Sequence, residues 1–236
     1  MWGGLRLAAV SLSSVLLVAC ASVPSIPYDR AAAGVNSIAI LDPQIPDKAT
    51  VYEAADLGKS FGLIGALVDS SIQSNREKKL AEIVETNKFS AKDSFISAVD
   101  DALQAHGYTF VDMPVERPKR DFLATYPDPP AGSEALLDLV VVEYGYLKAG
   151  AGKQAKWRPH MMLKVRLVRA SDKAVLMESW FNYNPVNETK GMVTIAPDPN
   201  FGYDDVDALV AGQAETVNGI QQAFVKTTAA MGTLLQ

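Results

Sequence analysis

Runs of apolar residues with strand-like spacing recur along the chain. The run SIAIL at 37–41 is continuously apolar and stops at an Asp-Pro pair, which predicts a short buried strand. A second strand is expected at 108–113 and a long apolar strand at 136–147. The segments 160–169 and 174–184 alternate apolar and polar residues around a short polar turn, which predicts a β-hairpin.

Helical spacing of apolar residues marks three further segments. The segment 57–84 predicts a helix that a charged stretch interrupts. A second helix is expected to begin after Ser90, which forms part of a capping box with Asp93, and to end at Gly107. From residue 204 onward, apolar residues at three- and four-residue steps predict a long C-terminal amphipathic helix.

Two long segments between these elements have no periodic pattern. The segment 114–134, which contains five prolines, and the segment 184–203 are expected to form surface loops. The order of elements predicts an α+β or α/β fold. We expect a single mixed sheet packed by helices, with a β-hairpin and a long C-terminal helix. No internal boundary divides residues 35–236, which are expected to form one domain.

The first twenty residues have the pattern of a secretory signal. A single basic residue, Arg6, precedes the apolar run 7–19. This run is shorter than the roughly 20 residues that a membrane-spanning helix needs. The sequence therefore predicts that residues 1–19 are a signal peptide that is removed.

The end of this segment resembles the lipobox of bacterial lipoproteins. It reads Leu17, Val18, Ala19 and then Cys20, which is the only cysteine of the chain. The resemblance implies that a diacylglyceryl group is attached to the Cys20 thiol and that the new amino terminus is acylated, for example with palmitate. The alternative is a plain signal peptide in which Cys20 is an ordinary small residue.

In the lipoproteins that this segment resembles, the residue after the cysteine directs sorting, and Ala21 favours the outer membrane over the inner one. Residues 20–34 contain two prolines and no periodicity, which predicts a lipidated, extended tether. The body is therefore expected on the periplasmic face of the outer membrane.

Composition excludes several classes of function. With 48% hydrophobic residues, 21% charged residues and a net charge of -5, the chain is expected to fold and has no general basic surplus for nucleic acid. One cysteine and two histidines argue against an internal disulfide and a metal centre. No catalytic motif is present, so we expect neither an enzyme nor a cofactor beyond the lipid on Cys20.

A locally basic segment supplies a candidate contact face. Arg158, Lys164 and Arg166 lie in or beside the first strand of the predicted hairpin, where they could meet anionic lipid headgroups or an acidic partner. The alternative is an ordinary solvated sheet face. Aromatic residues in or near the two long loops could mark a second contact surface: Tyr126, Trp157, Phe201 and Tyr203.

The order of elements is also similar to that of small periplasmic α/β domains of envelope proteins. The segments SIAILD, SAVDDALQAHGYTFVDM and LKVRLVRASDKAVLMESWF resemble the curli-assembly lipoprotein, the penicillin-binding-protein activator and the TolB amino-terminal domain. This resemblance implies envelope assembly or regulation through binding of a protein or an envelope polymer. The alternatives are a periplasmic hydrolase with an unrecognised site and a homo-oligomeric export component.

Overall fold

The computed structural model of the chain describes residues 22–54, 70–150, 152 and 154–236. The predicted signal peptide and the lipobox with Cys20 lie outside the described residues, as does the first part of the helix predicted at 57–84.

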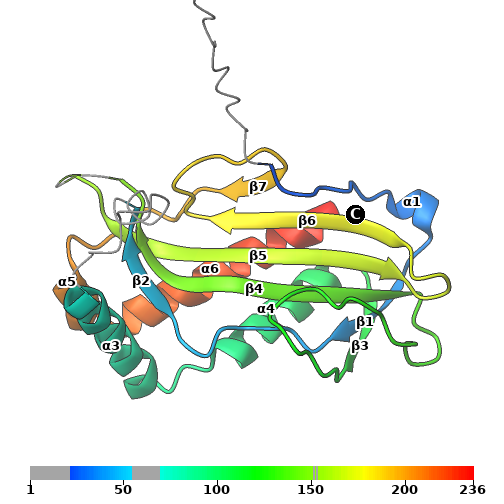
Figure 1. Ribbon diagram of the computed structural model, residues 1–236, viewed down its shortest axis with the longest axis horizontal. Helices are drawn as coiled ribbons and strands as arrows, with labels where there is room; N and C mark the ends of the chain where they lie inside the picture. The colour runs from blue at the N-terminus through cyan, green and yellow to red at the C-terminus, as the bar shows by residue number, and fades with distance from the viewer. Residues whose placement is uncertain (1–21, 55–69, 151, 153) are drawn as a thin grey trace, which may run out of the picture.

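Three long antiparallel strands form the middle of one mixed, seven-stranded sheet (Figure 1). They are β4 (Ala135–Lys148), β5 (Trp157–Arg169) and β6 (Val175–Tyr183). The β5–β6 pair is the predicted hairpin. Alternating residues of β5 are buried against the helices, as its sequence pattern predicts, whereas the apolar strand β4 is buried along most of its length.

Four short strands extend this sheet in parallel pairs. β1 (Ser37–Leu41) and β3 (Thr109–Met113) lie at one edge, and β7 (Met192–Ile195) lies at the other, in the order β3-β1-β4-β5-β6-β7. β2 (Thr50–Glu53) pairs with the C-terminal end of β4. Sequence analysis did not identify β2 or β7.

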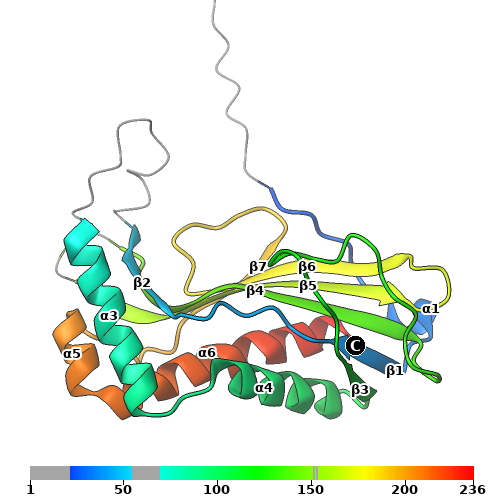
Figure 2. The same ribbon diagram turned by 60° about the horizontal axis from the view of Figure 1, so that its bottom comes forward.

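Helices cover one face of the sheet (Figure 2). α4 (Ala91–Ala105) and α6 (Gln213–Leu234) lie side by side beneath it, and α3 (Ser70–Thr86) contacts β2. The predicted C-terminal helix is divided into α5 (Val206–Ala211) and α6, and a short α1 (Arg30–Ala33) precedes β1. The expected α+β architecture of one mixed sheet with packed helices is confirmed.

The core between sheet and helices is rich in aromatic side chains. The ring of Phe224 on α6 lies 5.7 Å from that of Phe95 on α4 and 5.5 Å from that of Tyr144 on β4. α6 approaches β4 closely at Gly219, where a Cβ atom would lie 2.4 Å from the Tyr146 hydroxyl. A glycine at this position therefore allows the helix to pack directly on the sheet.

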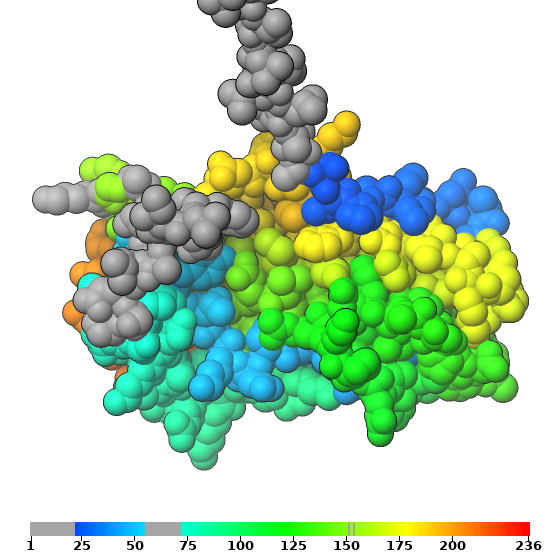
Figure 3. Space-filling view, in the orientation of Figure 1, coloured from blue at the N-terminus to red at the C-terminus, as the bar shows by residue number. Residues whose placement is uncertain are grey.

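The opposite face of the sheet is covered in part by the segment 114–134 (Figure 3). A buried ion pair attaches this segment to β4: Arg117 Nη1 lies 2.7 Å from Asp138 Oδ1, and neither side chain is exposed. Asp138 also accepts hydrogen bonds from the Leu123 amide at 2.9 Å and the Tyr126 hydroxyl at 3.0 Å. The long loop expected here is therefore fastened to the sheet.

Within the residues that the structure describes, no helix combines the length and the apolar character needed to cross a bilayer.

Candidate functional site

The N-terminal segment lies along the outer edge of β6. The Val23 amide donates to the Lys190 carbonyl at 3.1 Å, and Ile26 and Glu178 exchange two backbone hydrogen bonds of 2.8 and 3.1 Å. Residues 20–34 were expected to form an extended tether, but the described part, from Ser22 onward, is hydrogen-bonded to the body and contains the short helix α1.

Ser22, the first residue of the described chain at this end, lies beside the β7 edge. Cys20 precedes Ser22 by two residues, and two residues of chain span at most about 7 Å. Ser22 forms a parallel bridge with Lys190, which lies two residues before the start of β7.

The predicted basic contact face is divided and largely neutralised. Lys164 and Arg166 lie together on the face opposite α4 and α6, but Lys164 is paired with Asp121 and Arg166 Nη2 lies 2.7 Å from Glu178. Both cations also lie over the ring of Phe122, at 4.8 and 4.2 Å from its centroid. Each of these two positive charges therefore has an acidic side chain beside it.

Arg158 lies apart from this pair. Its Nη1 donates to the Asp198 carbonyl at 3.2 Å. The loop aromatics also differ in their roles: Trp157 is buried, and Tyr126 binds Asp138. Neither side chain therefore contributes to a free aromatic surface.

Glu143, His160 and Tyr52 form an acid–base cluster that sequence analysis did not identify. A bulge in β4 after Val141 brings Glu143 to the side of His160, and its Oε1 lies 2.8 Å from His160 Nε2. The Tyr52 hydroxyl donates to the same oxygen at 2.7 Å. The sequence offers one sign of this cluster, because Glu143 is a charged residue within a largely apolar strand. Its partner His160 follows only from the bulge in the structure.

Both ring nitrogens of His160 are engaged. Nδ1 lies 2.9 Å from the Tyr183 carbonyl oxygen, which can only accept, and Nε2 faces the Glu143 carboxylate. Both ring nitrogens therefore have an oxygen atom within hydrogen-bond distance. Burial acts to raise the pKa of Glu143, but the hydrogen bonds from His160 and Tyr52 and the His160 charge outweigh it and hold that pKa below its usual value.

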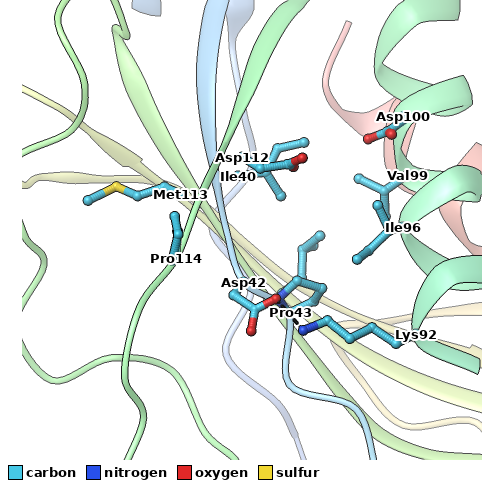
Figure 4. A pocket seen from close by; sticks show the side chains of 11 residues that line it. Ile40, Asp42, Pro43, Lys92, Ile96, Val99, Asp100, Asp112, Met113 and Pro114 are labelled. Atoms are coloured by element: carbon cyan, nitrogen blue, oxygen red, sulfur yellow. Dashed lines mark ion pairs between the residues drawn. The ribbon is translucent and has the colours of Figure 1, made fainter.

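An acidic groove lies between α4 and the β1–β3 edge (Figure 4). It has a volume of about 340 Å³ and is walled mainly by apolar side chains from both sides. The principal lining residues are Ile40, Pro43, Ile96, Val99, Pro114 and Leu139. Its volume falls in the range of about 300–1,000 Å³ that is typical of ligand sites.

Local folding places the charged groups of this groove. The Ser90 hydroxyl caps α4 by accepting from the Asp93 amide at 3.2 Å, which confirms the predicted cap. Lys92 and Asp100 lie two helical turns apart, and therefore on the same face of α4. Asp112 lies opposite on β3, in register with Ile40.

The two ends of the groove differ in charge. At one end Lys92 Nζ lies 2.7 Å from Asp42 Oδ1. At the other, Asp100 and Asp112 direct their carboxyl groups toward each other (Figure 4), with no cationic partner among the described residues. Asp100 Oδ1 is buried and has no hydrogen-bond partner within that part of the chain.

The surroundings of Asp100 disfavour its ionised form. Burial raises its pKa, and the charges of Asp112 and then Asp101 raise it further. A positively charged group between Asp100 and Asp112 would relieve both the repulsion and the missing hydrogen bond. The groove is therefore suited to a cation with an apolar stem.

Comparisons with known proteins give weak likenesses. No family model matches the chain, and no curated protein matches it. A DUF330-family protein from Xanthomonas campestris is 13% identical with a TM-score of 0.43, over 85% of this chain and 84% of the other. A PelC variant from Paraburkholderia phytofirmans, solved as a dodecamer, is 13% identical with a TM-score of 0.38, over 91% and 96%. At these scores neither likeness carries a functional conclusion.

Proposed function

We propose that the chain is a bacterial lipoprotein of the outer membrane whose periplasmic domain binds a protein or an envelope polymer. The observation that carries this proposal is the sequence LVAC at 17–20, which places the only cysteine at the modified position of a lipobox. Each buried methylene of an acyl chain contributes about 0.8 kcal/mol, so two or more chains on one residue anchor the protein durably.

The proposed anchor and the acidic groove would lie at opposite edges of the sheet. Ser22, which follows Cys20 by two residues in the sequence, lies beside the β7 edge, whereas the acidic groove lies at the β3 edge. Five strand spacings of about 4.8 Å place these edges about 24 Å apart. An anchored domain would present the groove away from the attachment point, and confinement at the membrane would raise its effective concentration near a partner.

A binding role is favoured over hydrolysis. The Glu143–His160 pair is the convergent acid and base that a hydrolase would require, but each group is already bound to the other. His160 is buried, and its second nitrogen faces a backbone carbonyl. Both ring nitrogens already contact oxygen atoms of the protein, and Tyr52 of β2 donates to Glu143, so we propose that the cluster holds β2 against the sheet.

Metabolic labelling with a fatty acid tests the anchor. We expect label and membrane partitioning in the natural chain and loss of both in Cys20→Ser, because serine offers no thiol for the diacylglyceryl group. Ala21→Asp is a matched control that should keep the label but move the protein toward the inner-membrane fraction. Equal labelling of the natural chain and Cys20→Ser would contradict the proposal.

A further inference from the structure

We propose that the β3 edge and the acidic groove together bind an extended protein segment, which pairs with β3 and places a lysine side chain between Asp100 and Asp112. This inference rests on the proposed binding function and narrows the partner to a protein. Two independent features carry it: an open strand edge and an unsatisfied acidic pair beside that edge.

The first feature is the backbone of β3. Among the described residues, its only strand partner is β1. The Thr109 amide donates to Asn36 and the Met113 carbonyl accepts from the Asp42 amide, both at 3.0 Å. In a parallel ladder alternate residues face the partner, so the amide and carbonyl groups of residues 110 and 112 point to the open edge.

The side chains of this edge are accessible as well. Phe110 is 36% exposed and Val111 is 43% exposed. Natural edge strands with accessible apolar residues readily pair with another strand. A polypeptide can satisfy the outward amide and carbonyl groups at the spacing of a strand, which favours a protein segment over other polymers.

The second feature is the charge of the groove. Three carboxylates, of Asp42, Asp100 and Asp112, and one ammonium, of Lys92, line it, which leaves a net charge of -2 when all are ionised. Lys92 forms an ion pair with Asp42 at the far end of the groove. The negative charge beside the β3 edge therefore belongs to Asp100 and Asp112.

A lysine side chain matches both the walls and the carboxylates. Its aliphatic stem can lie against Ile96 and Val99 while its ammonium donates to the two acids. A metal ion is less suited, because the walls are apolar and the described residues hold no cluster of three or more metal-ligating side chains. An added strand would carry every second side chain to the helix side of the sheet, where this groove lies.

Fluorescence anisotropy of labelled peptides tests the proposal. The probe is acetyl-Thr-Val-Lys-Val-Thr-amide carrying fluorescein, and the matched probe has glutamate in place of lysine. The protein is the full mature chain in a non-ionic detergent. We expect the lysine peptide to bind at least about tenfold more tightly than the glutamate peptide, since about 1.4 kcal/mol separates affinities by that factor.

Variants separate the groove from general charge attraction. Asp100→Asn and Asp112→Asn, each alone and together, should weaken or remove the preference for lysine, whereas Asp101→Asn, which has the charge change of either single variant but lies outside the groove, should keep it. Excess n-butylamine should weaken binding of the lysine peptide only. Equal binding of both peptides, no binding of either, or an unchanged preference in the double variant would overturn the proposal.

The absence of peptide binding can be interpreted further. If no peptide binds and Asp112→Asn makes the protein aggregate, Asp112 serves to protect the strand edge and binds no partner. Fatty-acid labelling of Cys20 does not depend on the groove. Failure of peptide binding is therefore distinguishable from failure of the proposed membrane anchor.

Discussion

Arg117 and Asp138 join the segment 114–134 to the sheet through a pair whose side chains are both fully buried. We predict that Arg117→Met lowers the free energy of unfolding by about 3–5 kcal/mol, because Asp138 would remain as a buried charge without its partner. Urea unfolding measures this loss. Arg169→Met is the matched control: its pair with Asp172 is exposed, so it should cost less than about 1 kcal/mol. Similar losses of unfolding free energy in the two variants would show that the Arg117–Asp138 pair does not stabilise the fold more than an exposed pair does.

Asp100 should give a stability that depends on pH. Burial, and then the charges of Asp112 and Asp101, raise its pKa in the folded protein. A raised pKa means that the folded protein holds the proton more tightly than the unfolded chain, so the ionised form destabilises the fold. Asp100→Asn should therefore stabilise the protein at pH 7. That gain should shrink as pH falls through the raised pKa and vanish near the usual value of about 3.9.

Thermal unfolding at several pH values measures the difference between Asp100→Asn and the natural chain. Asp128→Asn is the control, because Asp128 is 97% exposed and pairs with Lys173 at the surface. It should change stability by less than about 1 kcal/mol at every pH. A destabilised Asp100→Asn at pH 7 would show that Asp100 has a cationic partner.

At the scale of elements, local patterns predicted the strands and helices that are long or capped. Continuous apolar runs identified β1 and β4, alternation identified the β5–β6 hairpin, and Ser90 identified the start of α4. β2 and β7 are only four residues long and pair in parallel with distant strands. β2 also depends on Gly145, where a Cβ atom would lie 2.0 Å from the Thr50 carbonyl oxygen, and no local pattern reveals that approach.

Gly191 controls the docking of the N-terminal segment. It has φ +87°, and a Cβ atom there would lie 2.6 Å from the Val23 carbonyl oxygen. We predict that Gly191→Ala displaces residues 22–26 from the body, because the methyl group and the backbone of Val23 cannot occupy the same space. Hydrogen exchange of the Glu178 amide, which donates to Ile26 at 3.1 Å, should become faster.

Gly132→Ala is the matched control for this prediction. Gly132 has φ +91°, but a Cβ atom there meets nothing within 4 Å. Both variants carry the strain of a non-glycine residue at positive φ, and only Gly191→Ala displaces a neighbour. Equal exchange of the Glu178 amide in the two variants would show that the segment is held by other contacts.

At the scale of the whole molecule, the sequence predicts an anchor but gives no sign of the groove. The proposed lipobox is a contiguous pattern ending at Cys20, so the prediction needs no structure. The acidic groove combines Asp42 after β1, Asp100 on α4 and Asp112 on β3. Only the parallel pairing of β1 with β3 and the packing of α4 bring these carboxylates together.

The orientation of the domain on a membrane tests the account most directly. Lys190→Cys places a fluorescent label at the β7 edge and Val111→Cys places one on β3, while Cys20 is occupied by lipid in both. In vesicles carrying a headgroup quencher, we predict strong quenching at residue 190 and weak quenching at residue 111, because about 24 Å of sheet separates the two edges. Equal quenching at both positions, or stronger quenching at residue 111, would contradict a domain anchored at β7 that presents its β3 edge to a partner.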